Sequence, residues 1–200
     1  MNLLTSRRAV RNFEKNHKIP KNIFEQILKD AAYAPSCFNL QPWRFFIIET
    51  LENKKKLANC LNDGNKNQLE TSSAMILIFG DIYIKELKTK IYNDLEISKK
   101  EIIFKKINNY YDSMTSEEIK NEIFLECGIV SLQLMLSAKN YGYETCPIGG
   151  FNKKKLNKFF NIEKNYLPTL IIAIGKKVKN NQEQEVKNFK MKIKELTHWL

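Results

Sequence analysis

The segment AYAPSCFNLQPWRF at residues 32–45 joins a helix end, a small polar loop and the start of a strand. Apolar residues recur every four positions from Ile23 to Ala31, and this spacing predicts an amphipathic helix that the first proline of the segment ends. The residues from Trp43 onward are aromatic and β-branched and predict a strand. The loop between them is bracketed by prolines and offers donors in fixed positions to a polar ligand at a sheet edge. The alternative for this loop alone is an ordinary helix-to-strand connection in which Asn39 satisfies backbone groups.

The rest of the chain alternates between helix-like and strand-like stretches. Residues 74–80 form a continuous apolar run of strand length, which implies burial on both faces. The segment from Ile123 to Tyr141 predicts a helix that is apolar nearly all round, so part of its cover is expected from a second subunit. Residues 83–120 are polar and lysine-rich and are expected to form helices with a mobile connection. Further helices are predicted at 51–61 and 153–160, and further strands at 143–146 and 167–174.

The overall composition predicts a single α+β domain over residues 1–200. The 200 residues are 43% hydrophobic, with no internal repeat and no linker-like stretch. The N-terminus lacks the apolar stretch of a signal peptide, and no segment is long and apolar enough to span a membrane, so a cytoplasmic protein is expected. The charged tail from Lys176 to Leu200 contains apolar residues that need a docking surface, namely Val186, Phe189, Ile193, Leu196 and Trp199.

The cysteines, the histidines and the distribution of charge limit the kinds of site that the chain can form. The four cysteines form no C-x-x-C pair, which favours free thiols, and the two histidines have no metal-ligand spacing, so no metal site is expected. The net charge of +11 is spread over many lysines, which is typical of solvated faces. A basic nucleic-acid-binding module is the alternative from another functional class, but no aromatic-basic RNA motif or recognition helix is apparent.

Two further motifs are candidates for ligand binding. The segment SRRAVRNF at residues 6–13 holds three of the four arginines, in a chain that uses lysine nearly everywhere else. A guanidinium offers a rigid fork that suits phosphate, although a solvated basic patch is the alternative. The segment YGYETCPIGGF at residues 141–151 has paired glycines after a strand, which let a backbone approach a ligand closely. A plain turn into the next helix is the alternative there.

Together and in this order, the three segments resemble the nitroreductase family of flavoproteins. In that family the opening reads like R-R-S-x-R-x-F, the loop like A-P-S-x-x-N-x-Q-P-W, and the later segment like G-x-x-x-x-P-I-G-G-F. The resemblance runs from about Ser6 to Trp199 and is most specific in the loop, whereas residues 83–120 match no pattern. It implies an α+β fold with a mostly antiparallel central sheet, and a domain-swapped homodimer with two FMN molecules at its interface.

The resemblance also implies roles for individual residues. Arg7 and Arg8 would bind the FMN phosphate, with Ala9 beside them, and Arg11 would reach the pyrimidine edge of the flavin. Asn67, or Gln68, would contact the flavin or the ribityl chain. Residues contributed by the partner subunit would be Pro35, Ser36, Cys37 and Asn39. Residues beside the isoalloxazine would be Ile148, Gly149 and Gly150, with a backbone N–H directed at N5. Lys190 falls where the family usually has a phosphate-binding arginine.

Three positions depart from the family pattern. Ala9 replaces a common serine and removes one hydroxyl donor, Gly149 stands where some members have glutamate, and Lys190 supplies a point charge instead of a fork. These departures predict weaker FMN binding than is usual in the family. Cys37 would lie near the cofactor; it is interpreted as a small residue in a serine-like position, with a redox-sensing thiol as the alternative.

The implied activity is a two-step reduction. In the family, NADH or NADPH delivers a hydride to the flavin and leaves, and an acceptor such as a nitroaromatic or a quinone then takes the electrons. A fixed cation such as Arg11 favours the reduced flavin, because negative charge develops at N1 and the C2 carbonyl. No side chain need act as acid or base, so no catalytic residue is predicted. The alternative within the fold is a specialised flavoprotein, of dehalogenase or flavin-destroying type, with residues 83–120 as its substrate lid.

Overall fold

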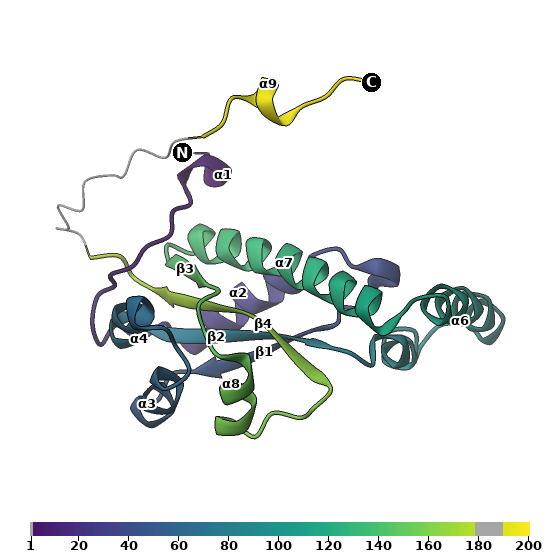
Figure 1. Cartoon of the computed structure of the whole chain (residues 1–200), viewed down its shortest axis with the longest axis horizontal. Helices are drawn as coiled ribbons and strands as arrows, with labels where there is room; N and C mark the ends of the chain where they lie inside the picture. The colour runs from purple at the N-terminus through teal and green to yellow at the C-terminus, as the bar shows by residue number, and fades with distance from the viewer. Residues whose placement is uncertain (1, 179–189) are drawn as a thin grey trace.

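The computed structural model describes residues 2–178 and 190–200 of the chain. Four strands form one antiparallel sheet in the order β1-β2-β4-β3, with helices on both faces (Figure 1). The strands are β1 (Trp43–Ile48), β2 (Ala74–Asp81), β3 (Glu144–Ile148) and β4 (Tyr166–Gly175). The α-helices are α1 (Leu3–Ser6), α2 (Lys21–Ala32), α3 (Leu51–Ala58), α4 (Lys66–Thr71), α5 (Lys88–Ile91), α6 (Ile97–Asp112), α7 (Ser116–Asn140), α8 (Lys153–Phe159) and α9 (Ile193–Leu196). Short 3-10 helices are η1 (Cys37–Asn39), η2 (Asp63–Asn65) and η3 (Ile84–Leu87). The expected α+β class with an antiparallel sheet is confirmed.

The central strand β2 is buried along its whole length, as its apolar run predicts. Successive side chains of a strand point to opposite faces, so the run divides between two cores. Ala74, Ile76 and Ile78 join the core formed with α2 and α7. Met75, Leu77 and Phe79 join the core formed with α3, α4 and α8. The chain is thus a three-layer structure, with the long helix α7 lying along one face of the sheet (Figure 1).

Helix α7 begins seven residues before the predicted start at Ile123. Thr115 caps the helix by accepting the N–H of Glu118, and the Glu118 side chain accepts the N–H of Thr115 in return, which is a capping box. The prediction was wrong at this end because the apolar pattern starts only where the helix reaches the sheet. At that point Gly80 allows a close approach, since a Cβ there would lie 2.0 Å from Ile123 Cγ2.

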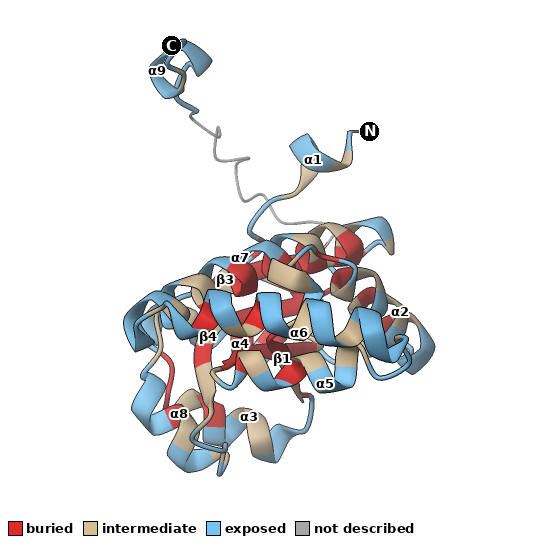
Figure 2. Cartoon of the chain, turned by 90° about the vertical axis from the view of Figure 1, so that its right-hand side faces the viewer, coloured by how far each residue is buried: buried red, intermediate tan, exposed pale blue. Residues whose placement is uncertain are grey.

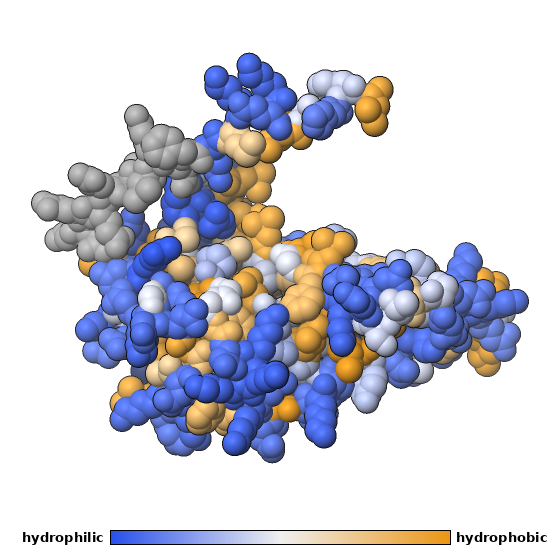
Figure 3. Space-filling view, viewed as in Figure 1, coloured by the Kyte–Doolittle hydropathy of each residue, from blue (hydrophilic) through white to orange (hydrophobic). Residues whose placement is uncertain are grey.

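Part of α7 presents apolar side chains that residues 2–178 and 190–200 do not bury. Leu125, Ile129 and Leu132 are 66%, 37% and 50% exposed and lie at i, i+4 and i+7, on one side of the helix. Figure 2 shows the other side of α7 buried against the sheet, and Figure 3 shows apolar side chains at the surface along this helix. The long helix α7 therefore has a second apolar face that the described residues leave exposed.

The two edges of the sheet differ. The N-terminal segment lies along the β3 edge, where Ala9 forms a parallel bridge with Thr145. Further along the segment, Phe13 forms an antiparallel bridge with Lys177, which follows the end of β4. At the opposite edge, β1 pairs only with β2 among the described residues. The segment 190–200 projects away from the sheet, and Trp199 is 95% exposed (Figure 1). Two of the tail residues expected to dock, Val186 and Phe189, lie outside the described residues. Among the helices that the structure describes, none is both long and apolar enough to cross a membrane.

Candidate functional site

The arginine segment, helix α4 and strand β3 meet at one corner of the sheet. The N–H of Val10 donates to the carbonyl of Thr145 at 3.0 Å, which holds the segment against β3. Asn67 Nδ2 donates to the carbonyl of Arg11 at 2.7 Å, which holds the same segment against α4. The structure therefore brings together Arg11 and Asn67, two of the residues that the sequence predicts at the site.

The paired glycines follow β3 into this corner. Gly150 lies so close to η2 that a Cβ would meet the side-chain nitrogens of Asn62 and Asn65, each at 3.0 Å. Its carbonyl accepts the N–H of Asn62 at 3.1 Å and the Asn65 Nδ2 group at 3.2 Å. Gly149 is exposed, and a Cβ there would have open space around it. The turn is thus fixed on one side by η2 and leaves Gly149 accessible to a ligand.

Gln68 marks an incomplete polar environment in the same corner. The residue is 2% exposed, and its Oε1 atom has no hydrogen-bond partner. It lies beside Cys146, whose pKa is raised by burial and lowered in smaller part by Gln68 and by the charge of Arg11. A buried amide oxygen without a donor is unusual in a folded protein, so Gln68 Oε1 retains the capacity to accept a hydrogen bond.

The arginines carry charge that the described residues do not neutralise. No carboxylate within residues 2–178 or 190–200 forms an ion pair with Arg7, Arg8 or Arg11. Arg8 Nη1 instead donates to the carbonyls of Thr5 at 2.7 Å and Arg7 at 3.0 Å. Guanidinium groups without counter-charges among the described residues suit a phosphate, which accepts several charge-assisted hydrogen bonds.

The proline-bracketed loop is strained and well anchored. Phe38, Asn39 and Gln41 have positive φ values of 48°, 51° and 51°, a region that non-glycine residues rarely occupy. Ser36 Oγ accepts the N–H of Gln41 at 2.9 Å, and Pro35 and Asn39 are exposed. Burial and, to a smaller extent, the Glu122 carboxylate raise the pKa of Cys37, so the thiol stays protonated at neutral pH. A protonated thiol is a poor nucleophile, which favours the serine-like interpretation of Cys37.

This loop and the arginine corner lie at opposite ends of the sheet. Thr145, which contacts the arginine segment, pairs with Ile174 on β4. Trp43, which follows the loop, pairs with Gly80, and Gly80 pairs with Leu167 on β4. Seven residues of β4 separate the two levels, which is about 23 Å at ~3.3 Å per residue. One chain therefore does not bring the two halves of the predicted site together.

Lys190 is also separate from the corner within the chain. It is exposed and lies in the segment that leads to α9, which Figure 1 shows away from the sheet. Of the predicted residues, Ala9, Arg11, Asn67, Gln68 and the Ile148–Gly150 turn form one group. Arg7 and Arg8 precede this group along the same segment, next to α1. The loop residues form a second group, and Lys190 stands alone.

The sequence prediction missed several residues that shape these two groups. Asn62 and Asn65 hold Gly150, but loop asparagines are too common to signal a site. Glu126 accepts the N–H of Cys37 at 2.5 Å and is 3% exposed. Its one signal in the sequence is that it is the single charged residue between positions 123 and 138.

Comparison with known proteins identifies the fold and the family. The family model described as "Nitroreductase family" matches residues 4–176. A crystal structure from Exiguobacterium sibiricum, provisionally named a nitroreductase and in complex with FMN, is 35% identical with a TM-score of 0.89 and covers 99% of this chain and 95% of that one. A Staphylococcus epidermidis structure, provisionally named an NAD(P)H:FMN oxidoreductase, is 34% identical with a TM-score of 0.91, covering 99% of this chain and 94% of its own.

Relatives with curated sequences agree. YdgI of Bacillus subtilis, provisionally named an NAD(P)H nitroreductase, is 33% identical over all of this chain and 96% of its own length. The CLA biosynthesis enone reductase of Lactiplantibacillus plantarum is 31% identical over 87% of this chain and 83% of its own length. The resemblance stated from the three sequence motifs is confirmed: this chain belongs to the nitroreductase family.

Proposed function

We propose that the protein is an FMN-dependent oxidoreductase that takes electrons from NADH or NADPH and passes them to an electron-poor acceptor. The observation that carries this proposal is the corner where the arginine segment, Asn67 and Gln68 of α4, and the accessible Gly149 turn meet. These groups fit a flavin mononucleotide, which has a phosphate at one end and a flat polar ring system at the other. The FMN-bound Exiguobacterium relative supports the assignment.

Each residue of the corner has a role that its chemistry allows. Arg7 and Arg8 hold the phosphate, with Lys190 as a further cation. Asn67 and Gln68 present amide groups to the ribityl chain or the flavin, and the Ile148–Gly150 turn lies beside the ring. Arg11 is the fixed cation near the pyrimidine edge, where its positive charge favours the reduced form. The bound cofactor supplies the hydride chemistry, and these residues bind and orient it.

The second half of the site requires a second copy of the chain. Pro35, Ser36, Cys37 and Asn39 lie at the far end of the sheet, out of reach of a flavin held by the same chain's arginines. The exposed apolar face of α7 and the apolar residues of the C-terminal segment provide surfaces for association. A homodimer in which each loop reaches the partner's arginine corner accounts for all of these features.

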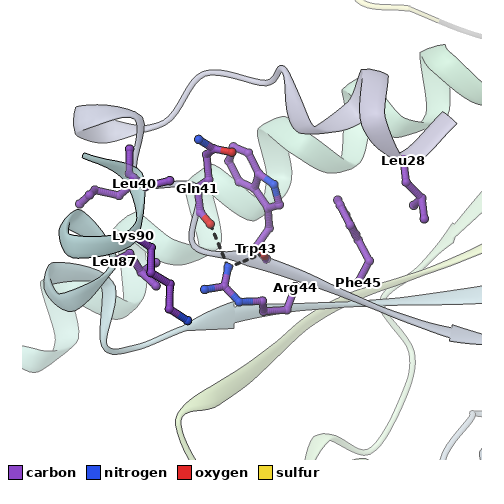
Figure 4. A pocket seen from close by; sticks show the side chains of 9 residues that line it. Leu28, Leu40, Gln41, Trp43, Arg44, Phe45, Leu87 and Lys90 are labelled. Atoms are coloured by element: carbon purple, nitrogen blue, oxygen red, sulfur yellow. Dashed lines mark hydrogen bonds between the residues drawn. The ribbon is translucent and has the colours of Figure 1, made fainter. Parts of the chain in front are cut away.

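The open edge of β1 offers a place for part of this association. A cavity of about 430 Å³ lies beside the start of β1, next to the proline-bracketed loop (Figure 4). Its walls combine apolar side chains with the cations Arg44 and Lys90. The lining residues are Leu28, Leu40, Gln41, Trp43, Arg44, Phe45, Leu87, Lys90 and Ile91.

The acceptors we propose are nitroaromatics, quinones and related electron-poor compounds. Two relatives support this range by their names, an oxygen-insensitive NADPH nitroreductase of Helicobacter acinonychis and the Lactiplantibacillus enone reductase. The electrons would be transferred in two separate half-reactions, because one face of the flavin serves both the nicotinamide and the acceptor.

The decisive test is the colour and the reduction of the purified protein. We expect a yellow protein whose bound FMN bleaches when NADH or NADPH is added under anaerobic conditions in a stopped-flow spectrometer. Adding a nitroaromatic, a quinone or an enone to the bleached protein should restore the colour and rank these acceptors. FMN that stays oxidised with both nicotinamides, or a colourless protein that rejects added FMN, would refute the proposal.

A further inference from the structure

The proline-bracketed loop has a strained backbone, so contacts with surrounding groups are needed to stabilise its conformation. Three of its residues, Phe38, Asn39 and Gln41, occupy the left-handed region without being glycine. Such conformations persist only where surrounding groups fix them, and they concentrate at functional sites. What fixes this loop therefore also determines how it meets a cofactor.

Several hydrogen bonds fix the loop, including those of Ser36, Tyr92, Arg44 and Glu126. Ser36 Oγ accepts the N–H of Gln41 at 2.9 Å from within the loop. Tyr92, which follows α5, donates its hydroxyl to the carbonyl of Phe38 at 2.8 Å. Glu126 on α7 accepts the N–H of Cys37 at 2.5 Å and is the one carboxylate that the described residues offer to the loop backbone.

The environment of Glu126 is not that of an ordinary structural carboxylate. The residue is 3% exposed, and its second oxygen, Oε2, has no hydrogen-bond partner. Burial, opposed by the Cys37 hydrogen bond and aided by the nearby Glu122 charge, raises its pKa to about 7. A glutamine in the same place would accept the same N–H without the cost of burying a charge. Burying the Glu126 carboxylate therefore costs desolvation free energy that a glutamine would avoid.

The titratable groups around Glu126 leave it as the one that changes charge near neutral pH. On α6, Tyr111 donates to Glu122 Oε1 at 2.5 Å and Tyr110 donates to Glu122 Oε2 at 2.8 Å, so the Glu122 carboxylate is satisfied. The pKa values of both tyrosines are raised, and that of Tyr110 reaches about 12. Burial also raises the pKa of the Cys37 and Cys127 thiols, so all four groups stay protonated at neutral pH.

We propose that Glu126 is a positioning residue of the cofactor site. Its carboxylate accepts the Cys37 N–H and so stabilises the Pro35–Gln41 loop in the conformation that contacts the partner's flavin. The inference rests on the proposed function, because the loop contacts a flavin only in the homodimer described above. A carboxylate accepts an N–H more strongly than a neutral group does. The hydrogen bond between Glu126 and the Cys37 N–H therefore weakens when the carboxylate is protonated or replaced by an amide.

The test compares E126Q with the wild-type chain at two pH values. At pH 8 Glu126 is ionised, and E126Q should bind FMN about tenfold more weakly in a fluorescence titration. At pH 6 Glu126 is mostly protonated, so the two proteins should differ less than about threefold. Protonation of the FMN phosphate affects both proteins alike and cancels in the comparison. The control is E101Q, which removes the same charge from an exposed position on α6 and should follow the wild type at both pH values.

A second readout needs no cofactor. Amide hydrogen exchange of the apo protein should show that the Cys37 N–H is less protected in E126Q than in the wild type at pH 8, after correction for intrinsic rates. If E126Q fails to fold, the wild type alone should show lower Cys37 protection at pH 6 than at pH 8. The inference is overturned if the wild type binds FMN, E126Q has the same FMN affinity at both pH values, and the Cys37 N–H is equally protected in the two proteins. If the wild type binds no FMN, the proposed function is refuted instead. The hydrogen-exchange data then decide whether the Glu126 carboxylate stabilises the loop.

Discussion

The double variant R7A/R8A should lose FMN affinity by about 10²–10⁴-fold, because each charge-assisted hydrogen bond to a phosphate is worth roughly 1.5–3 kcal/mol. Neither guanidinium forms an ion pair in the described part of the chain, so the fold should tolerate their removal. The measurement is a fluorescence titration of the apo variant with FMN at pH 8, beside its melting temperature.

The matched control is K15A/K18A. Lys15 and Lys18 are exposed residues of the same N-terminal region, and their replacement removes the same two positive charges. We expect the control to keep FMN affinity within about threefold of the wild type, since distant exposed charges are screened at ordinary ionic strength. Equal losses in the two variants would mean that the arginines act only through net charge, which would contradict their assignment to the phosphate.

The variant L125E/L132E should convert the protein to a monomer that cannot retain FMN. Both side chains are largely exposed on the uncovered face of α7, so the isolated chain should fold as well as before. In a dimer interface, two buried charges that replace two apolar contacts should raise the dissociation constant by more than about 10³-fold. Analytical ultracentrifugation gives the mass, and the absorbance at the flavin band gives the cofactor content.

A control at a distant apolar surface separates dimer loss from general effects of added charge. Leu51 begins α3 and Phe159 ends α8, both on the other side of the sheet from α7, and both are exposed. L51E/F159E should therefore remain dimeric and yellow. A dimeric L125E/L132E protein would place the interface elsewhere, and a monomeric variant that keeps FMN would refute a site shared between subunits.

Much of the fold follows from local patterns in the sequence. The β1 strand was predicted at its observed bounds because the residues from Trp43 to Ile48 are all aromatic or β-branched except Arg44. The predicted start of α7 was wrong because a polar first turn is set by the cap at Thr115, which an apolar period does not reveal. Residues 83–120 were expected to be helical, and the structure confirms η3, α5 and α6 there.

The sequence names the candidate site residues, whereas their positions within one chain come from the structure. The resemblance to the family named Arg11, Asn67 and Gly150, and the structure gathers them because the N-terminal segment lies along β3. The separation of the loop from this corner follows from strand register, which no local pattern encodes. Glu126 escaped prediction for a similar reason, since its partner Cys37 lies 89 residues away along the chain.

The central claim is that one flavin site is built from two chains, and complementation between two defective chains tests it most directly. One chain carries R7A/R8A, and the other carries P35E/N39D, which places negative charge at two exposed loop positions while Asp keeps the left-handed preference of residue 39. Neither homodimer should bind FMN at a concentration that saturates the wild type. Co-expressed with different affinity tags and purified through both, the heterodimer has one site with both defects and one with neither, so it should bind one FMN per two chains. A heterodimer without FMN, or a P35E/N39D homodimer that binds two, would contradict the shared site.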